Sequence, residues 1–537
     1  MKFFAKAKIF IAGAVSATLI TTAVTAYTSS MRKTITVDYN NIKINVDGEE
    51  IEPKDGNGKI VEPFIYEGTT YLPVRAVSQA LGKRVTWDGD TKTVYISSGL
   101  KGSNTPKKEL SVWIMPNSMY PDYDFIEVAM PFLNDNPDID LSITVMDWGS
   151  AWTRMTTAAT AGEAPDITQL GTTWVGPISY MDALVDLSGF INEDDFLPQI
   201  LRTTRVEGSS QMTAVPWFAE TRALFYRTDA CEKAGVNPTK DFETWESFKS
   251  ALKKLNNIEV DGKKLSALGM PGKNDWNVVH NFAPWVYGAG GSFLNKDFTK
   301  SEFSSQATFE GIKFYSELAK EGLMDMKALE QNTSDVEHGF FSHGKYATSI
   351  LGPWIIGTLE NYKQKFEADP SDGNDLVDRV GVAMLPAGPK GRFGFLGGST
   401  LSVFKSSKKQ DKAIELIKYL TTKKAQIEYC KKTGNLPTVK AAYDDPWITE
   451  NPMRKVFKAQ MDYAVHYPSI PYWGAVETFL QEGLSKVWDN VMEYDGKYSP
   501  ANTMKILEEE DYRINTILYY GSEDIDDIEI DSDNNLR

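Results

Sequence analysis

Cysteine and histidine are scarce in this chain, with two cysteines and four histidines among 537 residues. Cys231 and Cys430 are far apart in the sequence, which excludes a framework of disulfides, so we expect two buried thiols that act as small apolar residues. The histidines lack the short spacings of a metal site, and the acidic stretch 369–378 lacks the ligand order of a calcium loop. We therefore expect no metal and no other cofactor.

Positive charge and catalytic motifs are scarce as well. The formal net charge is −16, which argues against nucleic-acid binding because phosphate recognition needs a basic face. The sequence contains no G-x-S-x-G nucleophile turn, no phosphate-binding G-x-x-x-x-G-K-[ST] loop and no G-x-G-x-x-G dinucleotide motif. We therefore expect a protein that has no catalytic residues and is not an enzyme.

Long apolar runs are limited to one, at residues 9–26, and three lysines precede it. Small residues at Val24-Thr25-Ala26 form a plausible cleavage site, which is typical of a secretory signal. The run is also long enough to span a bilayer if it is left uncut. Residues 1–26 are therefore predicted to be a signal peptide or an uncleaved membrane anchor, and both place the rest of the chain outside the cell, secreted or held at the cell surface.

Residues 34–98 form a small first unit. ITVDYNNIKINVDG alternates apolar and polar residues and ends at an Asp-Gly turn, which predicts a strand, and a short amphipathic helix and a second Asp-Gly hairpin follow. The run from Tyr71 through Val74-Arg75 to Trp87-Asp88 resembles the copper amine oxidase N-terminal-like (stalk) domain of Gram-positive surface proteins. That resemblance implies a small α+β spacer. It implies no copper site, because this unit contains no His, Cys or Met. Residues 99–108, rich in Gly, Ser, Pro and Lys, are predicted to be a linker.

From residue 109 to about 495 the sequence alternates strand and helix patterns. ELSVWIM, IDLSITVM and DITQLG read as strands, with helical patterns between them, which predicts an α/β domain with a parallel sheet. Residues 496–520 are predicted to be one more helix. Residues 521–537 are acidic and predicted to be disordered.

A glycine pair stands just ahead of a strand in GGSTLSVFKSSKKQDKAIELIKYL, residues 397–420. Gly397 and Gly398 let the backbone turn and come close to a ligand, and Ser399 offers a hydroxyl there. The alternative is a tight turn into the strand without ligand contact. Ser407 and Gln410 have capping-box spacing, and apolar residues at i, i+3, i+4 and i+7 from position 413 predict a helix with one buried face.

Five stretches in order resemble the family 1 extracellular solute-binding proteins of ABC sugar importers. They are PDITQLGTTW (165–174), VPWFAETRALFYR (215–227), GPW (352–354), the glycine-pair stretch above and TGNLPT (433–438). The resemblance implies a two-lobed, periplasmic-binding-protein-like α/β fold of type II, with crossovers near residues 219, 397 and 435. Lobe 1 would hold about 109–218 and 398–432, and lobe 2 about 220–396 and 435–495.

A sugar has apolar C–H faces and a rim of hydroxyls, so aromatic faces together with charged or amide groups can bind it. Trp174, Trp354 and Trp473 match the family's stacking positions. Glu220 is placed to accept sugar hydroxyls, or alternatively to form a salt bridge with Arg222. The full set of expected ligand-binding residues is Asn117, Tyr120, Trp174, Glu220, Trp276, Trp354, Gly397, Gly398, Ser399 and Trp473. For each tryptophan the alternative is a place in the core, and for Asn117 and Tyr120 ordinary loop polarity.

The resemblance implies a monomer that captures a mono- or oligosaccharide between two lobes and delivers it to a membrane permease. One alternative is a surface-anchored sugar-sensing or adhesion protein with the same fold. A second is a glycoside hydrolase, which needs two cleft carboxylates, of which only Glu220 stands in a motif. A third is another ligand, such as a polyamine, a peptide or a metal chelate.

Overall fold

The computed structural model forms two compact units, residues 1–85 and 86–537, which are described separately. The described residues exclude the predicted signal or anchor and the acidic tail. They also exclude the predicted linker apart from its last residue. None of the helices among the described residues is long and apolar enough to cross a membrane. The described residues are 36–46, 49–53, 60–66, 68–81, 83–88, 93–97, 108–118, 120–162, 164–273, 275, 277–371 and 373–520.

The N-terminal part of the chain folds into short antiparallel pairs and one helix, and the predicted first strand is limited to β1 (Ile44–Val46). β1 pairs with β2 (Glu49–Ile51), and β3 (Phe64–Tyr66) pairs with β4 (Thr69–Tyr71), a pair that was not predicted from the sequence. The rings of Phe64 and Tyr71 stack across the second pair, 5.2 Å apart. α2 (Val74–Ala80) follows, and β5 (Arg84–Asp88) and β6 (Thr93–Ser97) form a further two-stranded sheet.

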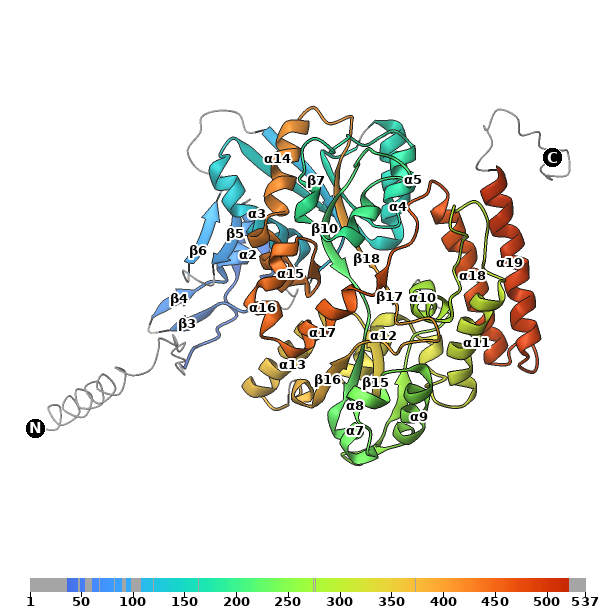
Figure 1. Ribbon diagram of the computed structural model, residues 1–537. Coiled ribbons are helices and arrows are strands. Elements are labelled where there is room, and N and C mark those ends of the chain that lie inside the picture. Colours follow the sequence, from blue (N-terminus) through green and yellow to red (C-terminus); the bar gives the residue numbers. More distant parts are fainter. Residues whose placement is uncertain are drawn as a thin grey trace, which may run out of the picture. The chain divides into compact units, whose positions relative to one another are not determined.

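The first lobe is built on a six-stranded sheet in the order β19-β10-β18-β9-β7-β8. Figure 1 labels three of these strands, β7, β10 and β18. β7 runs parallel to β8 and β9, as the alternating pattern predicts. β18 is antiparallel to both β9 and β10, so the prediction of a wholly parallel sheet is wrong, because β18 enters from the other lobe in the opposite direction. The strands are β7 (Lys108–Ile114), β8 (Ile139–Val145), β9 (Ile167–Gly171), β10 (Val215–Glu220), β18 (Gly397–Val403) and β19 (Leu436–Pro437).

Helices cover this sheet on both faces and form two separate clusters of buried side chains. α3 (Pro121–Asp135), α14 (Gln410–Leu420) and α15 (Lys423–Thr433) bury apolar residues in one cluster, and α4 (Trp148–Ala161) and α5 (Val175–Tyr180) in the other. α14 buries the predicted face. The predicted capping box is absent, because α14 begins at Gln410 and Lys409, not Ser407, is its N-cap residue. The Ser407 hydroxyl donates to Asp166 Oδ1 at 2.6 Å.

The second lobe has a four-stranded sheet in the order β14-β15-β11-β16. Its strands are β11 (Ala223–Arg227), β14 (Ser266–Gly269), β15 (Tyr346–Leu351) and β16 (Val380–Ala383). Its larger helices are α9 (Trp245–Leu255), α10 (Val278–Ala289), α11 (Gln306–Lys320), α12 (Thr333–Phe341), α13 (Trp354–Ala368), α17 (Pro452–Met461), α18 (Trp473–Val491) and α19 (Pro500–Tyr520). α19 lies against α18, and both pack on α11 (Figure 1).

Short elements occur in both lobes. They are α6 (Pro198–Leu201), α7 (Thr228–Ala234), α8 (Pro238–Asp241), α16 (Pro446–Thr449), β12 (Glu259–Val260), β13 (Lys263–Lys264), β17 (Gly394–Phe395) and β20 (Ala464–Val465).

The chain passes between the lobes near two of the expected positions and later than expected at the third. β10 of the first sheet ends at Glu220, and β11 of the second begins at Ala223. After β16 the chain returns to the first lobe, where β18 begins at Gly397. β19 still pairs with β10, and the chain contacts the second sheet again only through α17, so the third crossing follows residue 437 instead of lying near 435.

Candidate ligand-binding site

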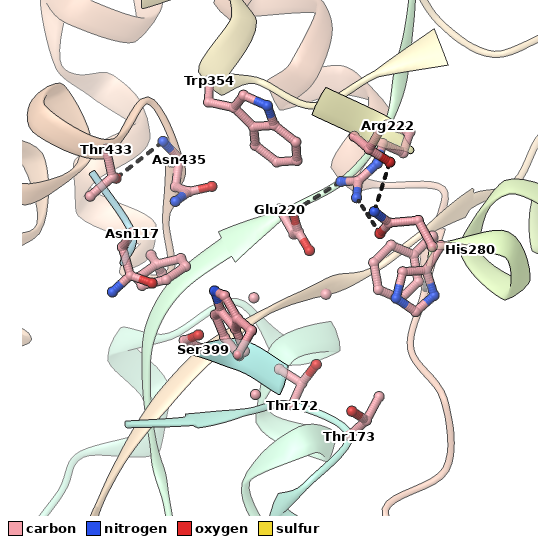
Figure 2. Close-up of a pocket in the computed structure, with 18 of the residues that line it drawn as sticks. Asn117, Thr172, Thr173, Glu220, Arg222, His280, Trp354, Ser399, Thr433 and Asn435 are labelled. Carbon is pink, nitrogen blue, oxygen red and sulfur yellow. Dashed lines mark hydrogen bonds and ion pairs between the residues drawn. The ribbon is translucent and has the colours of Figure 1, made fainter. Parts of the chain in front are cut away.

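A cavity of about 650 Å³ lies between the two lobes (Figure 2). The first lobe contributes the residues that follow β7 and β9, the start of α4 and the first residues of β18. The second lobe contributes α10, α12, the start of α13 and α18. The carboxyl ends of the parallel strands β7 and β9 therefore meet at this cavity, which is where open α/β sheets bind ligands.

Seven of the ten residues predicted from the sequence line this cavity. They are Asn117, Trp174, Glu220, Trp354, Gly397, Gly398 and Ser399. Figure 2 shows Glu220 on the crossover strand β10, with Trp354 on one side of it and Ser399 on the other. The cavity thus brings together residues that are more than 200 positions apart in the chain.

A buried glutamine positions the polar groups of the first lobe. Gln169 on β9 donates from Nε2 to Asn117 Oδ1 at 2.9 Å and to Ser399 Oγ at 2.8 Å. Asn117 in turn donates to Gln169 Oε1 at 2.8 Å and to the Tyr429 hydroxyl at 3.0 Å. This network fixes both side chains at the cavity wall. The role of Gln169 could not be predicted from the sequence, because it depends on strand pairing.

Indole rings stand on both sides of the cavity. Trp174 is the residue before α5, and its ring meets the edge of Trp148 at a centroid distance of 5.5 Å. Trp354 opens α13 in the second lobe and donates from Nε1 to Glu337 Oε1 at 2.9 Å. The motif Gly352-Pro353-Trp354 has a steric basis, because a Cβ on Gly352 would overlap the Trp354 ring. Aromatic faces are therefore offered by each lobe.

Glu220 and Arg222 form an ion pair at the first crossover. Arg222 donates from one terminal nitrogen to Glu220 Oε2 at 2.9 Å and from the other to Asn277 Oδ1 at 3.2 Å. The side chain of Arg222 is 5% exposed and that of Glu220 is 17% exposed. The salt bridge named above as the alternative role of Glu220 is thus present, and Glu220 still borders the cavity.

The glycine pair allows close backbone approach where β18 begins. Gly398 has φ of +134°, and a Cβ there would overlap the carbonyl oxygen of Phe218 on the neighbouring strand. A Cβ on Gly397 would lie 2.5 Å from the Phe395 ring and 2.9 Å from Glu220 Oε1. Both glycines line the cavity, so a tight turn and proximity to the site, given above as alternatives, occur together.

Three predicted residues do not contribute to the described cavity wall. Trp473 is fully buried, stacks on Tyr467 at 4.8 Å and belongs to the core of the second lobe, so its prediction as a stacking residue is corrected. Tyr120 directly precedes α3 and does not line the cavity. Trp276 lies outside the described residues.

Three lining residues with titratable side chains had no signal in the sequence. Burial raises the pKa of Glu337 to about 7, and the nearby carboxylates of Asp275 and Glu220 add to the rise. Burial also raises the pKa of Glu477 to about 7. His280 stacks on Phe395 at 3.9 Å, and burial followed by the charge of Arg222 holds its pKa well below the usual range, so this imidazole is neutral. Among the described residues, no group of three or more His, Cys, Asp or Glu side chains is placed to hold a metal.

The sequence and the fold both match known proteins. The family of bacterial extracellular solute-binding proteins matches residues 127–456, and the copper amine oxidase N-terminal domain matches residues 13–96. A binding protein of Brucella abortus is 26% identical over 387 residues, which cover 71% of this chain and 87% of that protein. The diacetylchitobiose binding protein DasA of Streptomyces coelicolor is 26% identical over 380 residues, which cover 68% of this chain and 81% of DasA.

Among solved structures, the GacH receptor of Streptomyces glaucescens superposes with a TM-score of 0.64 at 24% identity. The superposition covers 76% of this chain and 99% of GacH, and it shows that the two share their fold. The two-lobed α/β fold and the small N-terminal domain expected from the sequence are thereby confirmed. The match to the family model spans more than half of the chain. The chain therefore belongs to the bacterial extracellular solute-binding proteins.

Proposed function

We propose that this protein is the substrate-binding component of an ABC transporter, and that it captures a mono- or oligosaccharide in the cavity between its lobes. The observation that carries the proposal is the composition of the cavity wall, in which indole rings and hydrogen-bonding groups come from both lobes. The relatives support it: DasA is named for binding diacetylchitobiose, and GacH was solved in complex with acarbose.

The wall suits the two kinds of surface that a sugar presents. The rings of Trp174 and Trp354 offer apolar faces for the C–H side of a pyranose. Asn117, Glu220 and Ser399 offer amide, carboxylate and hydroxyl groups for its hydroxyl rim. A ligand that contacts both walls favours the conformation in which the lobes are close, which is the state that a permease would read.

The setting of the protein follows from the same proposal. The chain acts as a monomer outside the cell, secreted or held at the surface by its N-terminal segment, and the stalk-like unit serves as a spacer. A sensing or adhesion role is the second candidate, favoured by the match to the N-terminal domain at residues 13–96. A permease gene beside the gene for this protein supports transport, whereas a sensor-kinase gene in that position supports sensing.

A thermal-shift screen of the full chain against mono- and oligosaccharides tests the proposal. A ligand that binds only the folded state stabilises it by roughly 2.7 kcal/mol at a hundredfold excess over Kd. We expect one class of sugar to raise the melting temperature of the wild type and to leave that of Trp354→Ala unchanged. A matched control is Trp447→Ala, which removes an indole that packs under Arg454 outside the cavity. A shift with polyamines or peptides, and none with any sugar, would overturn the proposal.

A further inference from the structure

Carboxyl groups outnumber cationic side chains among the described residues that line the cavity. Among the described residues, Glu220, Glu337 and Glu477 contribute three carboxyl groups, and Arg222 is the one lining residue with a permanent positive charge. His280 is neutral. The described wall is therefore poor in cationic side chains.

The one guanidinium already has partners in the protein. Arg222 pairs with Glu220 at 2.9 Å and donates to Asn277 at 3.2 Å. Its central carbon lies 4.8 Å from the ring centroid of Trp354 and 5.8 Å from that of Phe395, so aromatic rings cover it. A phosphate or carboxylate on a ligand would have to compete with Glu220 for this cation. An anionic ligand therefore finds no unpaired cationic side chain among the described lining residues.

Two of the three carboxyl groups form no salt bridge with a described residue. Glu337 accepts a hydrogen bond from the neutral indole nitrogen of Trp354 at 2.9 Å, and both this bond and the charge of Arg222 lower its pKa against the larger effect of burial. Glu477 lies on α18, and no described residue donates a hydrogen bond to it or forms an ion pair with it. Burial makes the charged form of each carboxyl group costly, and a cationic group bound in the cavity would stabilise that form.

We propose that the sugar captured in this cavity carries a basic amino group, protonated when bound, and that Glu477 and Glu337 are the residues that select it. This inference rests on the proposed function, since it names a subclass of carbohydrate for the same cavity. An ammonium group forms charge-assisted hydrogen bonds with carboxylates and is also attracted to the faces of indole rings. Both kinds of group line this cavity, whereas a neutral sugar can offer the two carboxyl groups only hydroxyl donors.

Isothermal titration calorimetry on the full chain separates the possibilities. Each amino sugar, such as glucosamine, galactosamine or chitobiose, is compared with the sugar that has a hydroxyl at the same carbon and with the N-acetylated sugar. We expect the amino form to bind about tenfold or more tightly than both neutral forms. Equal or tighter binding of a neutral form overturns this inference and leaves the proposed function standing. Binding of spermidine alone, or of no carbohydrate, overturns both.

Isosteric variants test the two carboxylates. Glu477→Gln and Glu337→Gln are expected to lower the affinity for the amino sugar by a larger factor than the affinity for its neutral counterpart, and a thermal melt of each variant shows that it is folded. The matched control is Glu482→Gln on the same helix, whose side chain is 45% exposed and pairs with Arg513 outside the cavity. Loss of amino-sugar and neutral-sugar binding in equal proportion, or no change in either, contradicts the assignment.

Discussion

The guanidinium carbon of Arg222 lies 4.8 Å from the ring centroid of Trp354, so a cation on the crossover segment covers an indole at the start of α13. The same guanidinium pairs with Glu220, the last residue of β10 in the first lobe. Arg222 thus joins the crossover, the aromatic wall and a cavity carboxylate in one contact network. A change at any of the three is therefore expected to affect the others.

Removal of the Arg222 charge is expected to destabilise the protein. Arg222→Met leaves Glu220 without its partner in a largely buried position, and breaking such a pair costs about 3 kcal/mol. Urea denaturation followed by tryptophan fluorescence measures the loss. The double variant Arg222→Met with Glu220→Gln should recover part of it. Lys363→Met is the control, because Lys363 pairs with Asp378 at the surface and its removal should leave the midpoint unchanged. An unchanged midpoint in Arg222→Met would refute the network.

Substitution of Trp354 is expected to reduce affinity for the sugar. Trp354→Ala removes the ring face and should weaken binding about tenfold to a hundredfold, whereas Trp354→Phe keeps a face and should weaken it less. Calorimetry with the sugar that gives the largest thermal shift measures both. Trp447→Ala should lower stability and leave affinity intact. Wild-type affinity in Trp354→Ala is incompatible with stacking on this ring.

A side chain at Gly398 is expected to strain the start of β18. Gly398→Ala places a Cβ against the Phe218 carbonyl at φ of +134°, and we expect a loss of about 2 kcal/mol or more in the free energy of unfolding. Gly474→Ala is the matched control, because a Cβ there meets nothing within 4 Å and the residue lies in α18. That variant should gain about 0.5 kcal/mol from helix propensity. Equal stability of the two variants would contradict the account of the glycine pair.

Glu477 is expected to make the ligand-free protein less stable as the pH rises. Its pKa is about 7 in the folded protein and lies near 4.5 in the unfolded chain, so the folded state binds more protons between these values. Stability from this group is present below pH 4.5 and is lost as the pH rises through 7. Glu477→Gln should therefore be more stable than the wild type at pH 8, by about 2 kcal/mol, and similar to it at pH 4.5. Denaturant midpoints at the two pH values measure this, and a difference that is equal at both would argue against the burial of Glu477.

Local patterns in the sequence predicted most of the elements and the residues that come directly after strands. Asn117 and Trp174 follow β7 and β9, and Gly397 opens β18, so their place at the edge of a sheet could be predicted from strand order. The direction of β18 could not, because it depends on which lobe the chain has just left. The third crossover, which the family resemblance implied near residue 435, lies later because β19 still pairs with β10 of the first sheet.

The residues that sequence reasoning missed lie on helices that reach the cavity from far along the chain. Glu337 on α12 and Glu477 on α18 stand in ordinary amphipathic patterns, and only the packing of the second lobe turns them toward the site. Trp354 and Trp473 also show that packing between distant segments, and not local sequence, decides which residue reaches the cavity. Both begin a helix, yet Trp473 is covered by Tyr467 whereas Trp354 borders the cavity. Which of two similar tryptophans is accessible is decided by neighbours that are distant in sequence.

Hydrogen–deuterium exchange of the full chain, with and without the best-binding sugar, tests the central claim most directly. A ligand held between the lobes should protect backbone amides in 171–174 and 397–399 of the first lobe, and in 333–337 and around Trp354 of the second, in one titration. Protection of both sets at the same sugar concentration is the predicted result. Protection confined to one lobe, or found only in residues 36–97, would contradict binding in the cavity between the lobes.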